Sequence, residues 1–296
     1  MRIKAAAWLS VCLAILPAAR ATAQAWLPPE GSVNAGFVFN DTFNRQHYLP
    51  NGGTIDVGHT HTYIDSLVVS YAPSSRFLLA GTLPFVRARY IGTHPHKGST
   101  VDDGRYHSSI TDLRLQLHYQ WLEEPFALAP YIGVVRPLRD YPTLGHATAG
   151  RRLNEELIGF YIAKSLDEWL PRTYVQARYA YSFVEKVAGV SHDQSNADFE
   201  LGYFPGPRWS VRAIANWQNT YGGIDVPVPV GRPLYPYHDQ LARERYMQIG
   251  GGVAWTATSR LSAYGLYKHS VSGADGHRLN DGFTLGFGYT LRRGVQ

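Results

Sequence analysis

Alternation of apolar and polar side chains with a period of two residues is the feature that most restricts how this chain can fold. The clearest example runs from Ile110 to Trp121, where leucines and aromatic residues occupy one set of positions and polar residues the other. Successive side chains of a β-strand point to opposite faces, so this segment has one apolar and one polar face. A helix would spread the same charges around its circumference.

The same two-faced pattern returns along the chain and predicts twelve strands. Four further segments show it clearly, at 175–183, 198–203, 209–218 and 282–291. Seven more show it less cleanly, at 31–40, 61–72, 76–90, 126–138, 153–166, 243–255 and 260–271. No stretch after the first 23 residues has 18 consecutive apolar side chains, so the sequence predicts no membrane-spanning helix.

The links between these strands alternate between long and short. The long links are 41–60, 91–108, 139–152, 185–195, 219–242 and 272–280, and the short ones are 73–75, 123–125, 167–172, 206–207 and 256–259. Bacterial transmembrane barrels have short periplasmic turns, long extracellular loops and an even number of strands, whereas a secreted β-sandwich has no reason for this order. The sequence therefore predicts an all-β fold, a transmembrane antiparallel up-and-down β-barrel of about twelve strands.

The first 23 residues predict export. Arg2 and Lys4 precede a short apolar run, and Ala21-Thr22-Ala23 has the small residues of a cleavage site. An uncleaved anchor is the alternative, although the run is too short to span a bilayer as a helix. We expect residues 24–296 to form a single barrel domain in the outer membrane of a Gram-negative bacterium. Its expected partners are outer-membrane lipid, lipopolysaccharide and the barrel-assembly machinery.

The composition fits this location. Charged residues make up 17% of the chain, against about a quarter in soluble domains. The formal net charge of +5 includes three basic residues of the expected signal peptide, and without them 25 basic side chains face 23 acidic ones. We therefore expect no nucleic-acid partner. The only cysteine, Cys12, lies in the same peptide, so the exported chain is expected to have no thiol for disulfides, catalysis or metal binding.

Charged residues within the strands predict the lining of the lumen. An Arg or Lys that faces lipid at the bilayer midplane costs roughly 2–4 kcal/mol, so the charged faces should point inward. The residues expected there are Asp112, Arg114, His118, Arg178, Asp198, Glu200, Arg212 and Glu244. Both signs occur, which predicts mutual pairing as the alternative to contact with a solute. No side is assigned to Asp65, Arg87, Arg89 and Lys268.

Aromatic residues at the strand ends are expected to mark the two membrane interfaces. The candidates are Tyr119, Trp121, Trp209, Trp217, Trp255 and Tyr289. Aromatic girdles of this kind flank the apolar band of outer-membrane barrels, although each residue taken alone is also compatible with an ordinary sheet.

Four segments in the middle of the chain point to a known family. They are Thr111-Asp112-Leu113, Arg136-Pro137-Leu138 with Tyr141-Pro142-Thr143, Gly150 to Glu155, and Tyr174 to Tyr179. With these segments the chain resembles the outer-membrane proteins of the phenol-degradation meta-pathway (MetA) family, relatives of the channels for hydrophobic compounds and fatty acids. That family usually has Gly where Thr111 stands. The resemblance implies passive uptake of small hydrophobic or aromatic compounds, with no catalytic residue and no cofactor.

A proline-rich segment in the link 219–242 is a candidate capture site for an apolar solute. Its apolar residues are Val226, Val228, Val230, Leu234, Tyr235 and Tyr237. Prolines between them stiffen the chain, so the segment could fold into the mouth of the barrel and present an apolar surface. Packing against neighbouring loops is the alternative.

An outer-membrane lipid hydrolase or deacylase is the alternative function. The segment from Ser191 to Ala197 is similar to the His-x-Ser-Asn motif of outer-membrane phospholipases, and its candidate catalytic residues are His192, Ser195 and Asn196. A base and its nucleophile must lie within hydrogen-bond reach. His192 and Ser195 are three residues apart, which places them on opposite faces of a regular strand unless a bulge intervenes.

A metal-binding barrel, or a purely structural one, is the second alternative. Nine of the twelve histidines fall in predicted outer loops and His61 directly follows one, and the pairs His59/His61 and His94/His96 have a spacing that could bind a transition metal. Clusters of histidine are only a compositional indication, and solvated loop residues explain them better, so no metal site is assigned.

Overall fold

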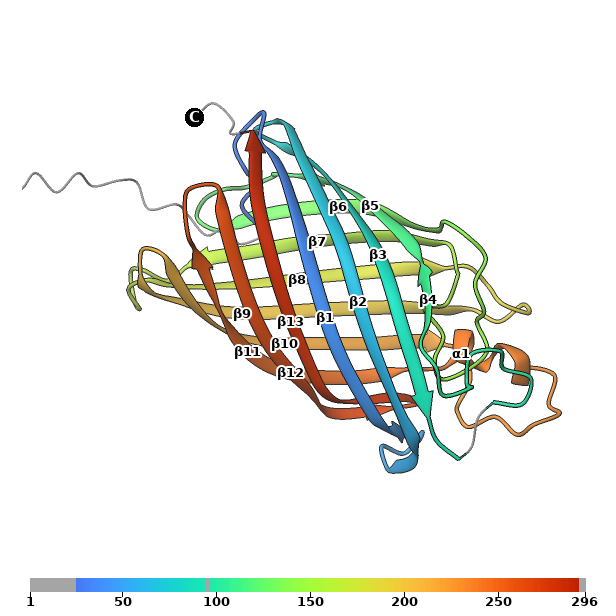
Figure 1. Ribbon diagram of the computed structural model, residues 1–296. Coiled ribbons are helices and arrows are strands. Elements are labelled where there is room, and N and C mark those ends of the chain that lie inside the picture. Colours follow the sequence, from blue (N-terminus) through green and yellow to red (C-terminus); the bar gives the residue numbers. More distant parts are fainter. Residues whose placement is uncertain (1–24, 94–95, 293–296) are drawn as a thin grey trace, which may run out of the picture.

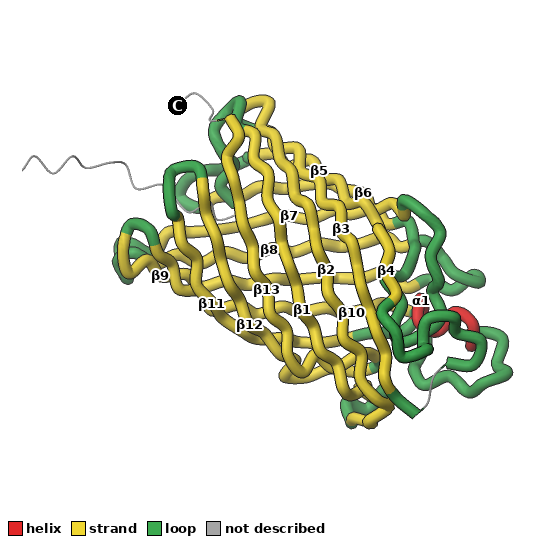
Figure 2. The backbone as a smooth tube through the Cα atoms, viewed as in Figure 1, coloured by secondary structure: helices red, strands yellow, loops and turns green. Residues whose placement is uncertain are grey.

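The computed structural model describes residues 25–93 and 96–292, which form a closed antiparallel β-barrel (Figures 1 and 2). The predicted signal peptide, residues 1–23, lies outside the described residues. Each strand pairs with its neighbours in the chain, and β13 (Gly276–Arg292) pairs with β1 (Val33–Tyr48) to close the sheet. β4 (His107–Ile110) and β5 (Asp112–Tyr119) both pair with β3 (Phe77–Ile91) and make one interrupted barrel strand. The predicted barrel of twelve strands is confirmed.

The remaining strands follow in chain order around the barrel. They are β2 (Thr54–Ser74), β6 (Ala127–Pro137), β7 (Glu155–Ser165), β8 (Thr173–Val184), β9 (His192–Gly206), β10 (Trp209–Gly222), β11 (Arg245–Thr256) and β12 (Leu261–Ala274). Crossing a bilayer takes about 9 to 11 residues of a tilted strand. Because β2 has 21 residues, the barrel extends well beyond the membrane along this wall.

The two faces of the strands differ as the alternation predicts. On β5, Leu115 and Leu117 are exposed on the outer surface, whereas His118 is buried inside. The expected girdle residues Trp121, Trp209, Trp217, Trp255 and Tyr289 are likewise exposed on the outside. An apolar outer surface is compatible with lipid, and the closed ladder satisfies the backbone groups that lipid cannot.

Two of the predicted long loops are wrong. In the expected loop 41–60, β1 continues to Tyr48 and β2 begins at Thr54, so only residues 49–53 form the turn. The expected loop 272–280 is a hairpin in which Asp275 alone separates β12 from β13. The expected loop 185–195 is shorter too, because β9 begins at His192. These strand ends lie beyond the lipid, where both faces can be polar, so the apolar alternation stops although the backbone pairing continues.

Three loops remain long, and they gather at one end of the barrel (Figure 1). They are residues 92–106, of which 94 and 95 lie outside the described residues, 138–154 and 223–244. The last contains a short 3₁₀ turn, η1 (Tyr235–Tyr237), and a one-turn helix, α1 (His238–Leu241). Among the described residues, no helix is long and apolar enough to cross a membrane.

The other end of the barrel is partly filled by the start of the described chain. Ala25 is fully buried in a cluster with Ala127, the first residue of β6, and Ala163, near the last residue of β7. Trp26 packs on the same cluster. The backbone N–H of Leu27 donates to Oε1 of Gln120 at 2.9 Å. This segment therefore narrows the end of the lumen that lies opposite the long loops.

Tyrosine rings inside the lumen lie directly over glycines on the neighbouring strand. Tyr174 covers Gly202, and Tyr264 covers Gly286 in the same way. Any Cβ atom at these glycines would overlap the ring. The hydroxyl of Tyr174 also donates to Glu200, which holds the ring in place.

We predict that Gly202→Val lowers the stability of the barrel. Overpacking a filled site typically costs about 1–3 kcal/mol, because rings or backbone must shift. Gly206 lies on the same strand with nothing within 4 Å of an added Cβ, so Gly206→Val is the matched control. The temperature at which the folded band disappears in heat-modifiability gels measures the effect. An equal unfolding temperature for the two variants would show that the ring contact does not matter.

Candidate functional site

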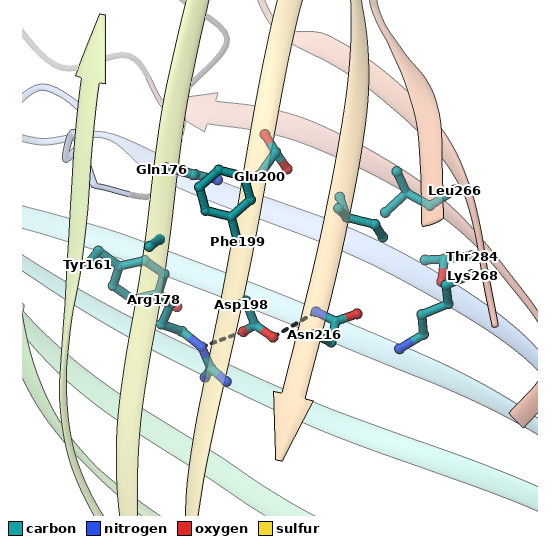
Figure 3. A pocket seen from close by; sticks show the side chains of 12 residues that line it. Tyr161, Gln176, Arg178, Asp198, Phe199, Glu200, Asn216, Leu266, Lys268 and Thr284 are labelled. Atoms are coloured by element: carbon teal, nitrogen blue, oxygen red, sulfur yellow. Dashed lines mark hydrogen bonds and ion pairs between the residues drawn. The ribbon is translucent and has the colours of Figure 1, made fainter. Parts of the chain in front are cut away.

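A cavity of about 250 Å³ lies in the lumen between β7 and β13 (Figure 3). Its wall combines tyrosine, amide, aliphatic and charged groups. The lining residues include Tyr161, Gln176, Arg178, Asp198, Glu200, Asn216, Leu266, Lys268 and Thr284. The inner face of each strand is the polar one. The cavity therefore has polar, charged and aromatic groups on its wall, although the outer surface of the barrel is apolar.

Neighbouring strands pair most of the charges in this cavity. Nε of Arg178 on β8 lies 2.6 Å from Oδ2 of Asp198 on β9. Asp198 also accepts a hydrogen bond from Nδ2 of Asn216 at 2.7 Å, as the dashed lines in Figure 3 show. Nη1 of Arg212 on β10 lies 3.7 Å from Oε2 of Glu200. Four of the eight residues expected in the lumen thus form two cross-strand ion pairs.

The other four expected lumen residues occupy separate positions. The carboxylate of Asp112 accepts a hydrogen bond from the hydroxyl of Tyr141 at 2.6 Å. Burial, and then the bond to Asp112, raise the pKa of Tyr141, so the phenol stays protonated as the donor. Glu244 lies at the mouth, where its Oε2 accepts from Nε2 of Gln218 at 3.4 Å. Arg114 faces Val135 across the strand pair.

His118 belongs to a cluster of three aromatic rings inside the barrel. Its ring lies 5.1 Å from that of Tyr131 and 5.5 Å from that of Tyr161, with interplanar angles of 21° and 25°. Tyr161 in turn lines the cavity. The lumen therefore provides flat aromatic surfaces beside its charged groups.

Two cations in the lumen have no acidic partner. Among the described residues, neither Arg114 nor Lys268 forms an ion pair, and the side chain of Lys268 borders the cavity (Figure 3). The sequence did not predict whether Lys268 faces the lumen or the lipid, and in the structure it faces the lumen. Asp65 and Arg87 pair at 3.0 Å near Tyr63, and Arg89 lies over the ring of Tyr106, which is exposed.

The proline-rich loop packs over the mouth of the barrel. Leu241 at the end of α1 is fully buried with Leu153 and Val184, and Leu234 packs partly on that cluster. The hydroxyl of Tyr235 accepts a hydrogen bond from the backbone N–H of Lys97 at 3.1 Å. These contacts attach loop 223–244 to its neighbours.

The expected capture residues do not form one apolar surface. Val230 and Tyr237 are exposed, Val226 and Val228 are half-buried, and Leu234 and Tyr235 contact other loops. A smaller cavity of about 140 Å³ lies at the mouth instead. Its lining is polar, with Arg151, Gln194, Gln218, Asp239, Gln240 and Glu244. The inner side of the loop is therefore hydrophilic, because α1 turns its polar residues toward the lumen.

His192, Ser195 and Asn196 do not come together as a catalytic group. β9 and β10 pair without a register shift between His192, which lies opposite Gly222, and Ser195, which lies opposite Asn219. Without a bulge, His192 and Ser195 point to opposite faces. Oγ of Ser195 instead contacts the hydroxyls of Tyr179 at 2.8 Å and Tyr221 at 3.3 Å.

Of the four histidines that the sequence suggested as metal ligands, one lies in a metal-like cluster. His59 packs on Phe43, and Nε2 of His61 lies 2.6 Å from Oδ1 of Asp41. His94 lies outside the described residues. His96 has potential ligand atoms beside it in two groups, one with His238 and Asp239 and the other with Asp102 and His146.

The sequence missed most of this histidine cluster. His146 and His277 also meet His47, with ligand atoms that all lie within 4.8 Å of one another. The members come from β1, β13 and all three long loops, separated by as many as 230 residues. No local spacing could have indicated them, because only the closure of the barrel brings these segments together.

Comparison with solved structures shows the fold. The COG4313 outer membrane channel from Pseudomonas putida F1 superposes with a TM-score of 0.71 at 13% identity, covering 91% of this chain and 99% of that one. The β domain of the Bordetella autotransporter BrkA gives 0.52 at 11% identity, over 88% and 100% of the two chains. The NanC porin gives 0.51 at 8% identity, over 86% and 100%.

Sequence comparison shows the family. No curated protein sequence matches this chain. The family model described as "Putative MetA-pathway of phenol degradation" matches residues 40–287, which is most of the barrel from β1 to β13. The chain, an outer-membrane β-barrel, therefore belongs to this family.

Proposed function

We propose that the protein is an outer-membrane channel for the passive uptake of small aromatic compounds, and that its preferred solutes are aromatic carboxylates. The observation that carries this proposal is the unpaired Lys268 in the same cavity as the ring of Tyr161. A carboxylate can pair with the ammonium group while its ring contacts the tyrosine. Membership of the phenol-degradation family supports an aromatic solute, and the likeness to an outer membrane channel supports passage through the barrel.

The size and polarity of the lumen favour an amphipathic solute over a purely apolar one. A cavity of about 150 Å³ holds a benzene molecule, so about 250 Å³ accommodates a single-ring acid. Displacing water from charged groups costs free energy unless the solute replaces the lost hydrogen bonds. A hydrocarbon cannot do this along a wall that contains Arg178, Asp198 and Lys268. An aromatic carboxylate can do so at its charged end.

We predict that Lys268→Gln weakens the interaction of aromatic anions with the channel. An ion pair in hydrated surroundings contributes about 0.2–1 kcal/mol, so the residence time of benzoate should fall by up to about fivefold. Planar-bilayer recordings measure it as the duration of benzoate-induced current blockades. Lys186→Gln is the control, since Lys186 is exposed in the turn 185–191 and the net charge changes equally. Equal blockade times in both variants would rule out Lys268 as a contact.

Asp198→Asn should shift the ion selectivity of the channel toward anions. The substitution removes a negative charge and leaves Arg178 without its ion-pair partner in the lumen. A unit charge about 4 Å from a permeating ion acts with about 1 kcal/mol in water, so the permeability ratio should change by up to about fivefold. The reversal potential in a KCl gradient measures this change.

Glu156→Gln is the matched control for that experiment. Glu156 is an exposed carboxylate on β7, next in sequence to the lumen-facing Glu155. Its loss should leave the reversal potential unchanged. A shift of the same size in both variants would show that the charge of the lumen does not set the selectivity.

The channel proposal also makes a prediction about the lipid-hydrolase alternative. Because His192 and Ser195 lie on opposite faces of β9, Ser195→Ala should not change the release of fatty acid from phospholipid vesicles. Mass spectrometry of the vesicle lipids measures this release. Hydrolysis by the unmodified protein that disappears in the variant would establish the enzyme instead.

A further inference from the structure

Three potential ligand atoms meet where two mouth loops touch. Nε2 of His96, in loop 92–106, lies 2.7 Å from Nε2 of His238 in α1. Oδ1 of Asp239 lies 3.5 Å from the first nitrogen and 3.6 Å from the second. All three side chains are largely buried, at 8%, 10% and 15% exposure. The three atoms thus form a small, largely buried triangle next to the polar mouth cavity that Asp239 also lines.

The hydrogen bonds around these rings make both Nε2 atoms acceptors. Nδ1 of His96 lies 3.0 Å from Oδ2 of Asp102. Asp102 accepts backbone N–H groups of His96, His146 and Ala147 as well, so it acts as an acceptor and Nδ1 of His96 carries the hydrogen. Nδ1 of His238 contacts the carbonyl oxygen of Tyr235, which can only accept. In a neutral imidazole whose Nδ1 is the donor, Nε2 has a lone pair and no hydrogen.

Asp239 completes the set with a third acceptor. Its Oδ2 accepts the backbone N–H of Gly145 at 2.8 Å, which fixes the carboxylate and turns Oδ1 toward the two histidines. When both imidazoles are neutral, two lone pairs and a carboxylate oxygen therefore face one another. Such an arrangement repels itself unless a positive charge lies at its centre.

We propose that His96, His238 and Asp239 bind a divalent transition metal ion of the zinc type, with water as the fourth ligand. Two histidines and a carboxylate are a common ligand set for zinc. Ligand atoms about 2.0–2.1 Å from a tetrahedral ion are about 3.3 Å apart. The distances to Asp239 are close to this value, and the two imidazoles need to separate by about 0.6 Å.

The surroundings of the site have the features of a metal centre. Ligating histidines usually donate their other N–H to a carboxylate or a backbone carbonyl, which fixes the ring and its tautomer. Asp102, 1% exposed, does this for His96, and the carbonyl of Tyr235 does it for His238. The ring of His146 lies 4.2 Å from that of His96 and supplies a further imidazole beside the site.

A metal ion here would join loop 92–106 to loop 223–244 across the mouth of the barrel. Among the described residues, the hydrogen bond from the backbone N–H of Lys97 to Tyr235 also links these two loops. Binding energy that stabilises only the joined state would hold His96 against α1. The metal site depends only on the geometry of the loops. It can therefore be present or absent whether or not the barrel transports the proposed solute.

Isothermal titration of the refolded, untagged protein with zinc chloride tests the site. We expect one ion per barrel, and Co²⁺ in its place should give the visible absorption of a tetrahedral site. His96→Gln, His238→Gln and Asp239→Asn should each weaken binding at least about tenfold. Heat-modifiability gels confirm that each variant is folded.

His107→Gln is the matched control, because His107 also pairs with a carboxylate, Asp103 at 2.8 Å, but belongs to no three-ligand group among the described residues. It should bind zinc as the unmodified protein does. Two results would overturn the proposal. One is the absence of saturable zinc binding by the unmodified protein, which would mean that a proton occupies the triangle. The other is equal affinity in the His96→Gln and His107→Gln variants.

Discussion

The structure depends on the need to satisfy every backbone N–H and C=O group in a solvent that offers no hydrogen bonds. The pairing of β13 with β1 meets this need, because it leaves no strand edge exposed to lipid. Once the sheet is closed, each strand has one face toward lipid and one toward the lumen. The outer face must be apolar, so the polar chemistry of the chain is concentrated inside the barrel and at its ends.

The enclosed charges then determine which solutes the lumen favours. Two ion pairs, Arg178–Asp198 and Arg212–Glu200, neutralise part of the wall, and Lys268 remains as an unpaired cation in a cavity that Tyr161 also lines. The loops over the mouth and the segment at Ala25 narrow both ends. Selection therefore combines a narrow path with a lining that holds aromatic rings and one unpaired cation, Lys268. The proposed metal site lies in the loops and would act on access rather than on selection.

The sequence predicted the parts of the structure that lipid controls. Alternation located the membrane-spanning part of each strand, and the low charge content and the resemblance at Tyr174 to Tyr179 agreed with it. Outside the lipid this signal is lost, which is why the paired ends at 41–48 and 54–60 were predicted as a loop. The histidine cluster was hidden for another reason. His96 and His238 are 142 residues apart and meet only because loops from distant strands fold over the same mouth.

The flux of a permanently charged aromatic anion tests the central claim most directly. Benzenesulfonate does not cross lipid unaided, so its entry into liposomes that contain the protein reports passage through the barrel. The account predicts that benzenesulfonate enters several times faster than benzyltrimethylammonium, a cation of similar size, because Lys268, the charge without an ion-pair partner in the lumen cavity, is positive. Entry no faster than into protein-free liposomes, or faster entry of the cation, would contradict it.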